Sequence, residues 1–171
     1  TLLLANDIDL TGVDWSDARP SLKGVFNGQG HTVSNLSIQQ TGTGTSASTT
    51  LYCGLFDSLR NNAEVRNLNL ASPSITLTQS ASYGCFAGAL AGWVNTGSNS
   101  RNVTVNNVQV TNPTIQVTGG GEGSNDIANV FAGGLIGRVD FAAFTNCSVT
   151  GGSLSATTTN VNTPLAATGG L

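Results

Sequence analysis

One short pattern returns four times along the chain: an apolar residue, any residue, asparagine, an apolar residue, any residue and another apolar residue. Its copies occupy residues 33–38, 65–70, 105–110 and 144–149, so their asparagines stand 32, 40 and 39 residues apart. Repeats of this length are typical of folds in which one small unit stacks on copies of itself, because a single unit cannot bury its apolar side alone. The repeat therefore indicates a stacked, solenoid-like architecture.

Two further short runs recur with the same period. Glycine-leucine segments occupy 51–56, 86–91 and 131–136, with a truncated copy at 167–171, and β-like runs occupy 74–77, 114–117 and 153–155. Successive strand residues face opposite sides, which makes Phe86, Gly88 and Leu90 inward-facing. We therefore predict an all-β chain that forms a parallel β-helix (β-solenoid) of about four coils, with three short strands per coil.

The alternation slips within the asparagine motif, because Val65 shares a face with Asn67 whereas Leu68 shares one with Leu70. A corner between two strands explains the slip. We predict that the corner asparagines turn inward, stack on one another and hydrogen-bond along the stack as an asparagine ladder. The predicted ladder consists of Asn35, Asn67, Asn107 and Asn146. The alternative, four amides that gather a ligand, is less favoured because the alternation buries them.

Spacing varies mainly in four segments, 39–50, 78–85, 118–130 and 156–166, which are rich in Thr, Ser, Gly or Asn. Coils stacked in register bring such insertions to one edge, where repeat proteins often bind partners. The candidate binding residues are Tyr52, Trp93, Thr43, Thr45 and Asn125, and the two aromatic residues would form a contact platform for sugar or protein. The alternatives are that the segments are solvated connectors and that the aromatic side chains only cover the edge of a coil.

Charge and hydropathy exclude two classes of partner. The net charge is −3 and the six basic residues are scattered, so we predict no nucleic-acid partner and no binding to an anionic membrane surface. Membrane insertion is not expected either, since the longest apolar stretches fall far short of the ~20 residues that cross a bilayer. Few charges, together with abundant Thr, Ser, Asn and Gly, favour an extracellular or cell-surface location.

Five short runs of the sequence also suggest a family resemblance, and they occupy residues 24–33, 35–38, 54–56, 89–92 and 134–137. Together they resemble the GLUG-motif repeat of large bacterial surface proteins and adhesins, although Asp57 and Ala89 stand where that repeat has glycine. The resemblance implies a right-handed parallel β-helix in an exported, multidomain protein, and it implies no reaction. We therefore expect residues 1–171 to be one β-solenoid segment of a longer chain, with a lead-in strand and loop over 1–30 and repeats over 31–171, the last of them truncated.

The three cysteines do not form a metal-binding pattern. Cys53 and Cys147 occupy apolar positions of the repeat and are predicted to be buried thiols, whereas Cys85 is expected to point outward or into a loop. A disulfide between Cys53 and Cys85 on adjacent coils is conceivable although the alternation disagrees, and the sequence leaves this open. No Cys-x-x-Cys motif or Cys/His cluster is present, so we predict no metal site.

Parallel β-helices also host polysaccharide lyases and hydrolases, which use paired carboxylates. Asp7 and Asp9 share a face but lie in the lead-in strand, and no pair of acidic residues recurs at equivalent positions of neighbouring coils. Residues 120–128 fit a calcium-binding nonapeptide in which asparagine replaces the aspartate, at a single copy. We predict no cofactor, with Ca²⁺ near Glu122, Asn125 and Asp126 as the weaker alternative.

These observations favour a non-enzymatic extracellular module, either an adhesin-like stalk or a segment that binds a cell-surface glycan or protein. A first alternative is a structural subunit of an extracellular filament or sheath, which assembles with neighbouring solenoid segments through open solenoid ends. A second alternative is a polysaccharide-active β-helix enzyme that depends on residues such as Asp7 or Asp14.

Overall fold

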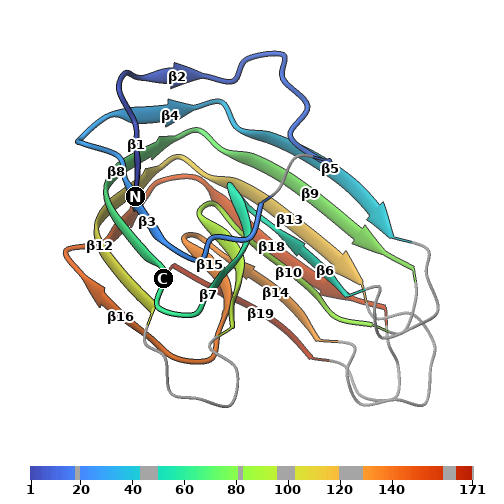
Figure 1. Ribbon diagram of the computed structural model, residues 1–171. Helices are drawn as coiled ribbons and strands as arrows, with labels where there is room; N and C mark the ends of the chain where they lie inside the picture. The colour runs from blue at the N-terminus through green and yellow to red at the C-terminus, as the bar shows by residue number, and fades with distance from the viewer. Residues whose placement is uncertain are drawn as a thin grey trace.

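The computed structural model describes residues 1–17, 20–42, 50–80, 83–95, 103–119, 129–159 and 165–170, and the regular elements of these residues are β-strands (Figure 1). The strands pair in parallel throughout. An eight-stranded sheet contains β1 (Leu2–Leu3), β2 (Ile8–Asp9), β3 (Val25–Asn27), β4 (Thr32–Ser34), β8 (Glu64–Ala71), β12 (Val103–Thr111), β16 (Ala142–Thr145) and β17 (Ser148–Thr150). The protein is therefore all-β with parallel sheets.

Three smaller sheets complete the fold. The first, the β5–β18 sheet, contains β5 (Ser37–Gly42), β9 (Ser74–Gln79), β13 (Thr114–Gly119) and β18 (Ser153–Thr158). The second, the β6–β19 sheet, contains β6 (Leu51–Cys53), β10 (Cys85–Gly88), β14 (Val130–Gly133) and β19 (Ala166–Gly169). The third, the β7–β15 sheet, contains β7 (Phe56–Arg60), β11 (Ala91–Asn95) and β15 (Ile136–Val139).

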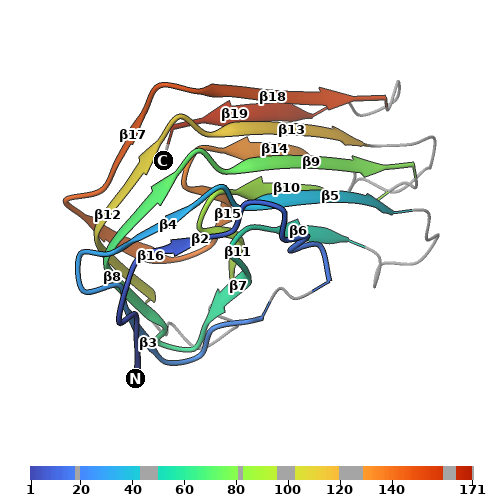
Figure 2. The same cartoon turned by 90° about the horizontal axis from the view of Figure 1, so that it is seen from above.

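The chain passes through these sheets in a fixed order: eight-stranded sheet, β5–β18 sheet, β6–β19 sheet, β7–β15 sheet, and back to the first, one strand further along. We call one such passage a circuit. Figure 2 shows successive circuits lying on one another like steps, with β5, β9, β13 and β18 side by side. The carboxyl ends of these four strands therefore lie next to one another.

Like residues stack on like residues in the core. Ile75 pairs in register with Ile115, and Leu77 pairs with Val117, and each of these side chains is at most 1% exposed. In β9 and β13 these inward residues alternate with outward polar ones, as a strand with one buried face requires. Burial of a side chain of this size contributes about 1.5–3 kcal/mol, so the aligned apolar rows hold consecutive circuits together.

The circuits β8–β11 and β12–β15 each hold four named strands and not the three expected from the sequence. The run 86–91, which the alternation predicts as one strand, is divided between β10 and β11, with a bend at Ala89 and Leu90. Glycine permits this fold-back, because a Cβ on Gly88 would lie 2.5 Å from the Cα of Ile136 and 2.6 Å from the carbonyl oxygen of Ala91. The segment after the bend belongs to a different sheet, which the alternation alone could not reveal.

The corner asparagines adopt the left-handed conformation, with φ of 52° at Asn67, 54° at Asn107 and 53° at Asn146. Asn67 and Asn107 lie within β8 and β12, whereas Asn146 lies between β16 and β17. A left-handed residue at this place lets the apolar residues on both sides point inward, so the asparagine itself stays on the outer side. Asn107 and Asn146 are exposed and Asn67 is half-buried, so the expectation of an inward-facing ladder is wrong. On this outer side, Asn107 Nδ2 donates to Asn67 Oδ1 at 3.0 Å and Asn67 Nδ2 donates to Asn27 Oδ1 at 3.3 Å.

Asn35 does not belong to that row. The register of β4 with β8 pairs Ser34 with Ala71, which aligns Asn35 with Ser72 at a second corner of the circuit. Both residues are left-handed there, with φ of 59° at Asn35 and 52° at Ser72. Asn35 is exposed and its Nδ2 donates to Asp9 Oδ1 at 2.8 Å. Both corners have the same sequence motif, and for that reason the prediction put all four asparagines in one row.

Candidate functional site

Three aromatic rings stack across neighbouring strands of the β6–β19 sheet. Phe86 on β10 is in register with Tyr52 on β6 and with Phe131 on β14. The ring centroids are 5.6 Å apart between Tyr52 and Phe86 and 5.2 Å apart between Phe86 and Phe131, close to the ~4.8 Å spacing of paired strands. We call Tyr52, Phe86 and Phe131 the aromatic ladder.

Trp93 joins the aromatic ladder from the β7–β15 sheet. Its indole stacks on Tyr52 with a centroid distance of 4.9 Å and an interplanar angle of 17°. Phe86 is 1% exposed, whereas Tyr52 and Trp93 are half-buried. Burial also raises the pKa of Tyr52, so its phenol stays neutral. The two sheets thus place a set of aromatic rings side by side.

Two arginines flank the rings. The guanidinium carbon of Arg60 lies 6.0 Å from the centroid of Trp93, and that of Arg138 lies 5.5 Å from the centroids of both Trp93 and Phe86. These distances are typical of cation–π contacts. Arg60 Nε also donates to Ser58 Oγ at 2.8 Å. Two of the six basic residues of a chain with net charge −3 therefore converge on one tryptophan.

Asp140 connects the indole with one of these arginines. Trp93 Nε1 donates to Asp140 Oδ2 at 3.1 Å, and Arg138 Nε lies 3.3 Å from Asp140 Oδ1. The side chain of Asp140 is 29% exposed. A carboxylate accepts about four hydrogen bonds, so one that is held by a single donor on each oxygen still has acceptor capacity toward solvent.

A pocket of about 450 Å³ opens at the end of the aromatic ladder. On β19, the residue in register with Phe131 is Ala167, whose side chain is too small to cover a ring. Phe131, Arg138, Asp140, Ala167 and Thr168 line the pocket, together with neighbouring glycines and aliphatic residues. The pocket thus combines one aromatic ring, one cation and one carboxylate.

The structure brings together two of the residues proposed from sequence, Tyr52 and Trp93. The other three, Thr43, Thr45 and Asn125, lie outside the described residues. The calcium alternative at Glu122, Asn125 and Asp126 also lies outside them. Among the residues that the structure does describe, no group of three or more His, Cys, Asp or Glu could hold a metal ion.

Sequence reasoning missed Phe86, Phe131, Arg138 and Asp140. Phe86 and Phe131 recur at one position of the glycine-leucine segments, but the alternation assigned them to the core, where Cys85 and Ala87 point instead. Arg138 follows Leu135 by the same three residues that separate Trp93 from Leu90. This shared spacing is the sequence signal that could have predicted the contact between Arg138 and Trp93.

The cysteines are free thiols, and the expected position of Cys85 is wrong. Cys53 and Cys85 are both 0% exposed, because both lie on the inner face of the β6–β19 sheet. The register pairs Cys53 with Ala87, two residues beyond Cys85, so the two thiols are offset along their strands. Their Sγ atoms donate to Gln40 Oε1 and to the carbonyl oxygen of Thr118, respectively. Burial raises the pKa of Cys85 to about 12.

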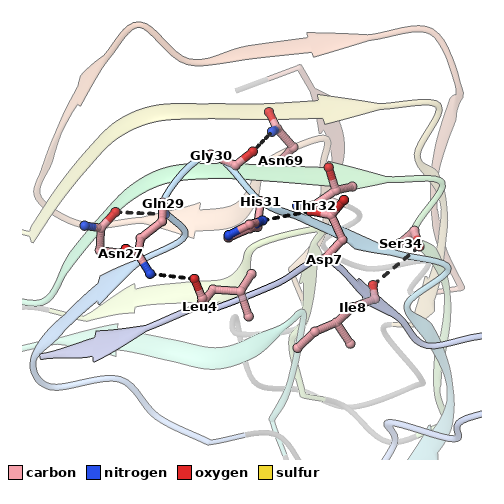
Figure 3. A network of polar contacts seen from close by, with 10 residues as sticks. All are labelled: Leu4, Asp7, Ile8, Asn27, Gln29, Gly30, His31, Thr32, Ser34 and Asn69. Carbon is pink, nitrogen blue, oxygen red and sulfur yellow. Dashed lines mark hydrogen bonds and ion pairs between the residues drawn. The ribbon is translucent and has the colours of Figure 1, made fainter.

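Asp7 and Asp9, the acidic residues near the start of the chain, form hydrogen bonds with residues in and next to β4, and Figure 3 shows those of Asp7. Asp7 Oδ1 accepts a hydrogen bond from the Thr32 amide at 2.8 Å and lies 3.1 Å from His31 Nδ1. The Thr32 amide and His31 hold the pKa of Asp7 below its usual value, and Asn35 and Thr11 do the same for Asp9. These carboxyls are therefore ionised acceptors, whereas the general acid of a glycosidase needs a raised pKa.

The comparisons with known proteins give one distant likeness. No family model matches the chain, and no curated protein matches it. The chain is similar to a crystal structure described as that of a "putative immunoglobulin A1 protease from Bacteroides ovatus", with 17% identity and a TM-score of 0.46. The match covers 92% of this chain and 51% of the other, so this chain spans about half the length of that protein. In the described part of the chain, no helix is long and apolar enough to cross a membrane.

Proposed function

We propose that the chain is a right-handed parallel β-helix of about four coils and acts as a non-enzymatic binding module of an extracellular surface protein. The recurring order of parallel strands supports the β-helix, and crossovers between parallel strands are right-handed in nearly all proteins. The likeness of its repeats to the GLUG motif of bacterial adhesins supports the location.

The observation that carries the binding role is the cluster of contacts that joins Trp93 to Tyr52, Arg60, Arg138 and Asp140. Aromatic and arginine side chains are enriched where proteins bind partners. Here they gather on a chain in which only 9% of the residues are charged. The stacked circuits support this cluster on paired strands, and its partner is a cell-surface glycan or protein.

Retention of the purified protein on whole cells and on immobilised glycans tests this function. We expect the wild type to bind and Trp93→Ala to bind at least several-fold more weakly, while far-UV circular dichroism shows that the β fold is kept. Gln116→Ala, an exposed change on the β5–β18 sheet, is the matched control and should bind like the wild type. Equal binding by all three proteins, or by none, contradicts the proposal.

A further inference from the structure

We infer that Arg60 and Lys23 bind the carboxylate of an acidic sugar in a cell-surface glycan. The inference rests on the proposed binding function and names the class of ligand. Leu22 and Leu59, both buried, form a parallel bridge, and the Arg60 amide donates to the Leu22 carbonyl oxygen at 2.9 Å. Lys23 and Arg60 follow these inward leucines, so both cations lie on the outer face of neighbouring strands, ~4.8 Å apart.

These two cations have no acidic partner in the described part of the chain. The other two basic residues that the structure describes, Arg66 and Arg138, each form an ion pair with an acidic residue two positions away. On the other side of Arg60, the residue in register on β11 is the amide Asn95. Like charges on neighbouring strands repel each other, and an anion bound between Arg60 and Lys23 would remove this repulsion.

Arg60 is held in position for such a ligand. Its Nε donates to Ser58 Oγ at 2.8 Å, Ser58 Oγ lies 3.0 Å from Ser21 Oγ, and the guanidinium carbon lies 6.0 Å from the centroid of Trp93. The terminal N–H groups stay available as donors, and a guanidinium binds a carboxylate through two parallel hydrogen bonds. A side chain that is already positioned loses less conformational freedom on binding. Lys23, which is exposed, adds a second positive charge.

The surroundings of Arg60 suit a sugar ring. Tyr52 and Trp93 are half-buried, so part of each ring is accessible near the cation. Aromatic side chains of this kind combine an apolar body with a polar tip, and a sugar combines an apolar ring face with hydroxyl groups. Asn61 and Asn62, which follow Arg60, are exposed, and their amides offer both donors and acceptors to hydroxyls.

The backbone around Arg60 disfavours an acidic peptide as the ligand. An extended peptide binds a sheet by adding a strand to a free edge. β7, which carries Arg60, is paired on one side by β11 and on the other by the bridge between Leu22 and Leu59. A peptide therefore finds no free main-chain groups there, and the ligand is recognised through side chains.

Binding of the purified wild type to polygalacturonate and alginate, each compared with its methyl-esterified form, tests the inference. The paired ligands differ only in the charge of the carboxyl group. The protein as a whole, at −3, does not attract a polyanion nonspecifically, so a preference for the acid form must come from local cations. We expect at least one acid form to bind about fivefold more tightly than its ester at low salt. The preference should disappear at about 1 M salt, where charges are screened within about 3 Å.

Variants separate this site from the general charge of the chain. Arg60→Gln should weaken binding of the acid form about fivefold and Lys23→Gln about twofold, with little effect on the ester. Arg66→Gln is the matched control, because it removes the same charge from an arginine that is already paired with Glu64, and it should bind like the wild type. Far-UV circular dichroism verifies that each surface variant keeps the β fold.

Three results overturn the inference: equal affinity of the wild type for the acid and ester forms, equal losses in Arg60→Gln and Arg66→Gln, or tighter binding of poly-glutamate than of either acidic glycan. The outcomes also separate this inference from the proposed function. A wild type that adheres to cells through Trp93 without preferring the acid forms overturns the carboxylate site and leaves the binding module intact. A wild type that is retained on neither cells nor glycans overturns both.

Discussion

Replacement of Asn107 tests the corner geometry that lets each circuit turn. Asn107 has a φ of 54° and donates a hydrogen bond of 3.0 Å to Asn67 Oδ1 from an exposed position. Alanine in this left-handed conformation costs about 1–2 kcal/mol, whereas glycine adopts it freely. The exposed hydrogen bond contributes about 0.5–1 kcal/mol, at the low end of the usual range.

Asn107→Ala should therefore lower the free energy of unfolding by about 2 kcal/mol, since it loses the hydrogen bond and also strains the backbone. Asn107→Gly loses the same hydrogen bond, and the greater conformational entropy of glycine in the unfolded chain lowers the free energy of unfolding by about a further 0.5–1 kcal/mol. Glycine adopts the left-handed conformation without strain. We expect the glycine variant to be the more stable of the two by about 1 kcal/mol.

Urea denaturation followed by circular dichroism measures these differences from the midpoints at a common slope. Asn106→Ala is the control, because Asn106 is exposed and its φ is not positive, and it should change stability by less than about 0.5 kcal/mol. An alanine variant as stable as the glycine variant would refute the left-handed corner, and an unchanged Asn107→Gly would show that the asparagine row contributes nothing.

Three further predictions concern packing, thiol chemistry and pH. Gly137→Ala should cost about 1–3 kcal/mol by thermal denaturation, since its Cβ would lie 2.7 Å from a backbone nitrogen of β10, whereas Gly24→Ala meets no atom within 4 Å and should be nearly neutral. Burial raises the pKa of Cys85 to about 12, so Cys85 should react with Ellman's reagent only on unfolding, and the half-buried Cys147 should react first. Rapid modification of Cys85 in the folded protein would contradict its burial. The pKa of Asp9 is lowered by its hydrogen bonds, so its contribution is present above about pH 4 and is lost as pH falls, and Asp9→Asn should flatten the acid limb of the stability curve; an unaltered limb would contradict this.

The parallel all-β architecture could be predicted because the repeat spacing and the apolar alternation describe the same stacking. Val65 and Val105, for example, occupy equivalent motif positions and pair in register at 0% exposure. Asn35 was misplaced because left-handed corners of two kinds share one letter pattern. Only the hydrogen-bonding register of β4 separates them.

The candidate site was predictable in part. Tyr52 and Trp93 stood out as rare aromatic residues, but their contact depends on the fold-back at Gly88, where one apolar run changes sheets. Phe86 was assigned to the core because alternation shows which residues share a face of a strand but not which of the two faces is the inner one. Arg138 lies far along the chain from Trp93, and only the pairing of β15 with β11 brings them together.

The most direct test of the account is to incubate the purified protein with cell-surface polysaccharides and to measure, in one experiment, both retained protein and released reducing ends. We predict saturable retention that falls in Trp93→Ala, with no increase in reducing ends over the incubation. Release of reducing ends by the wild type, abolished by Asp7→Asn or Asp14→Asn, would contradict a non-enzymatic binding module and identify the chain as a polysaccharide-cleaving enzyme.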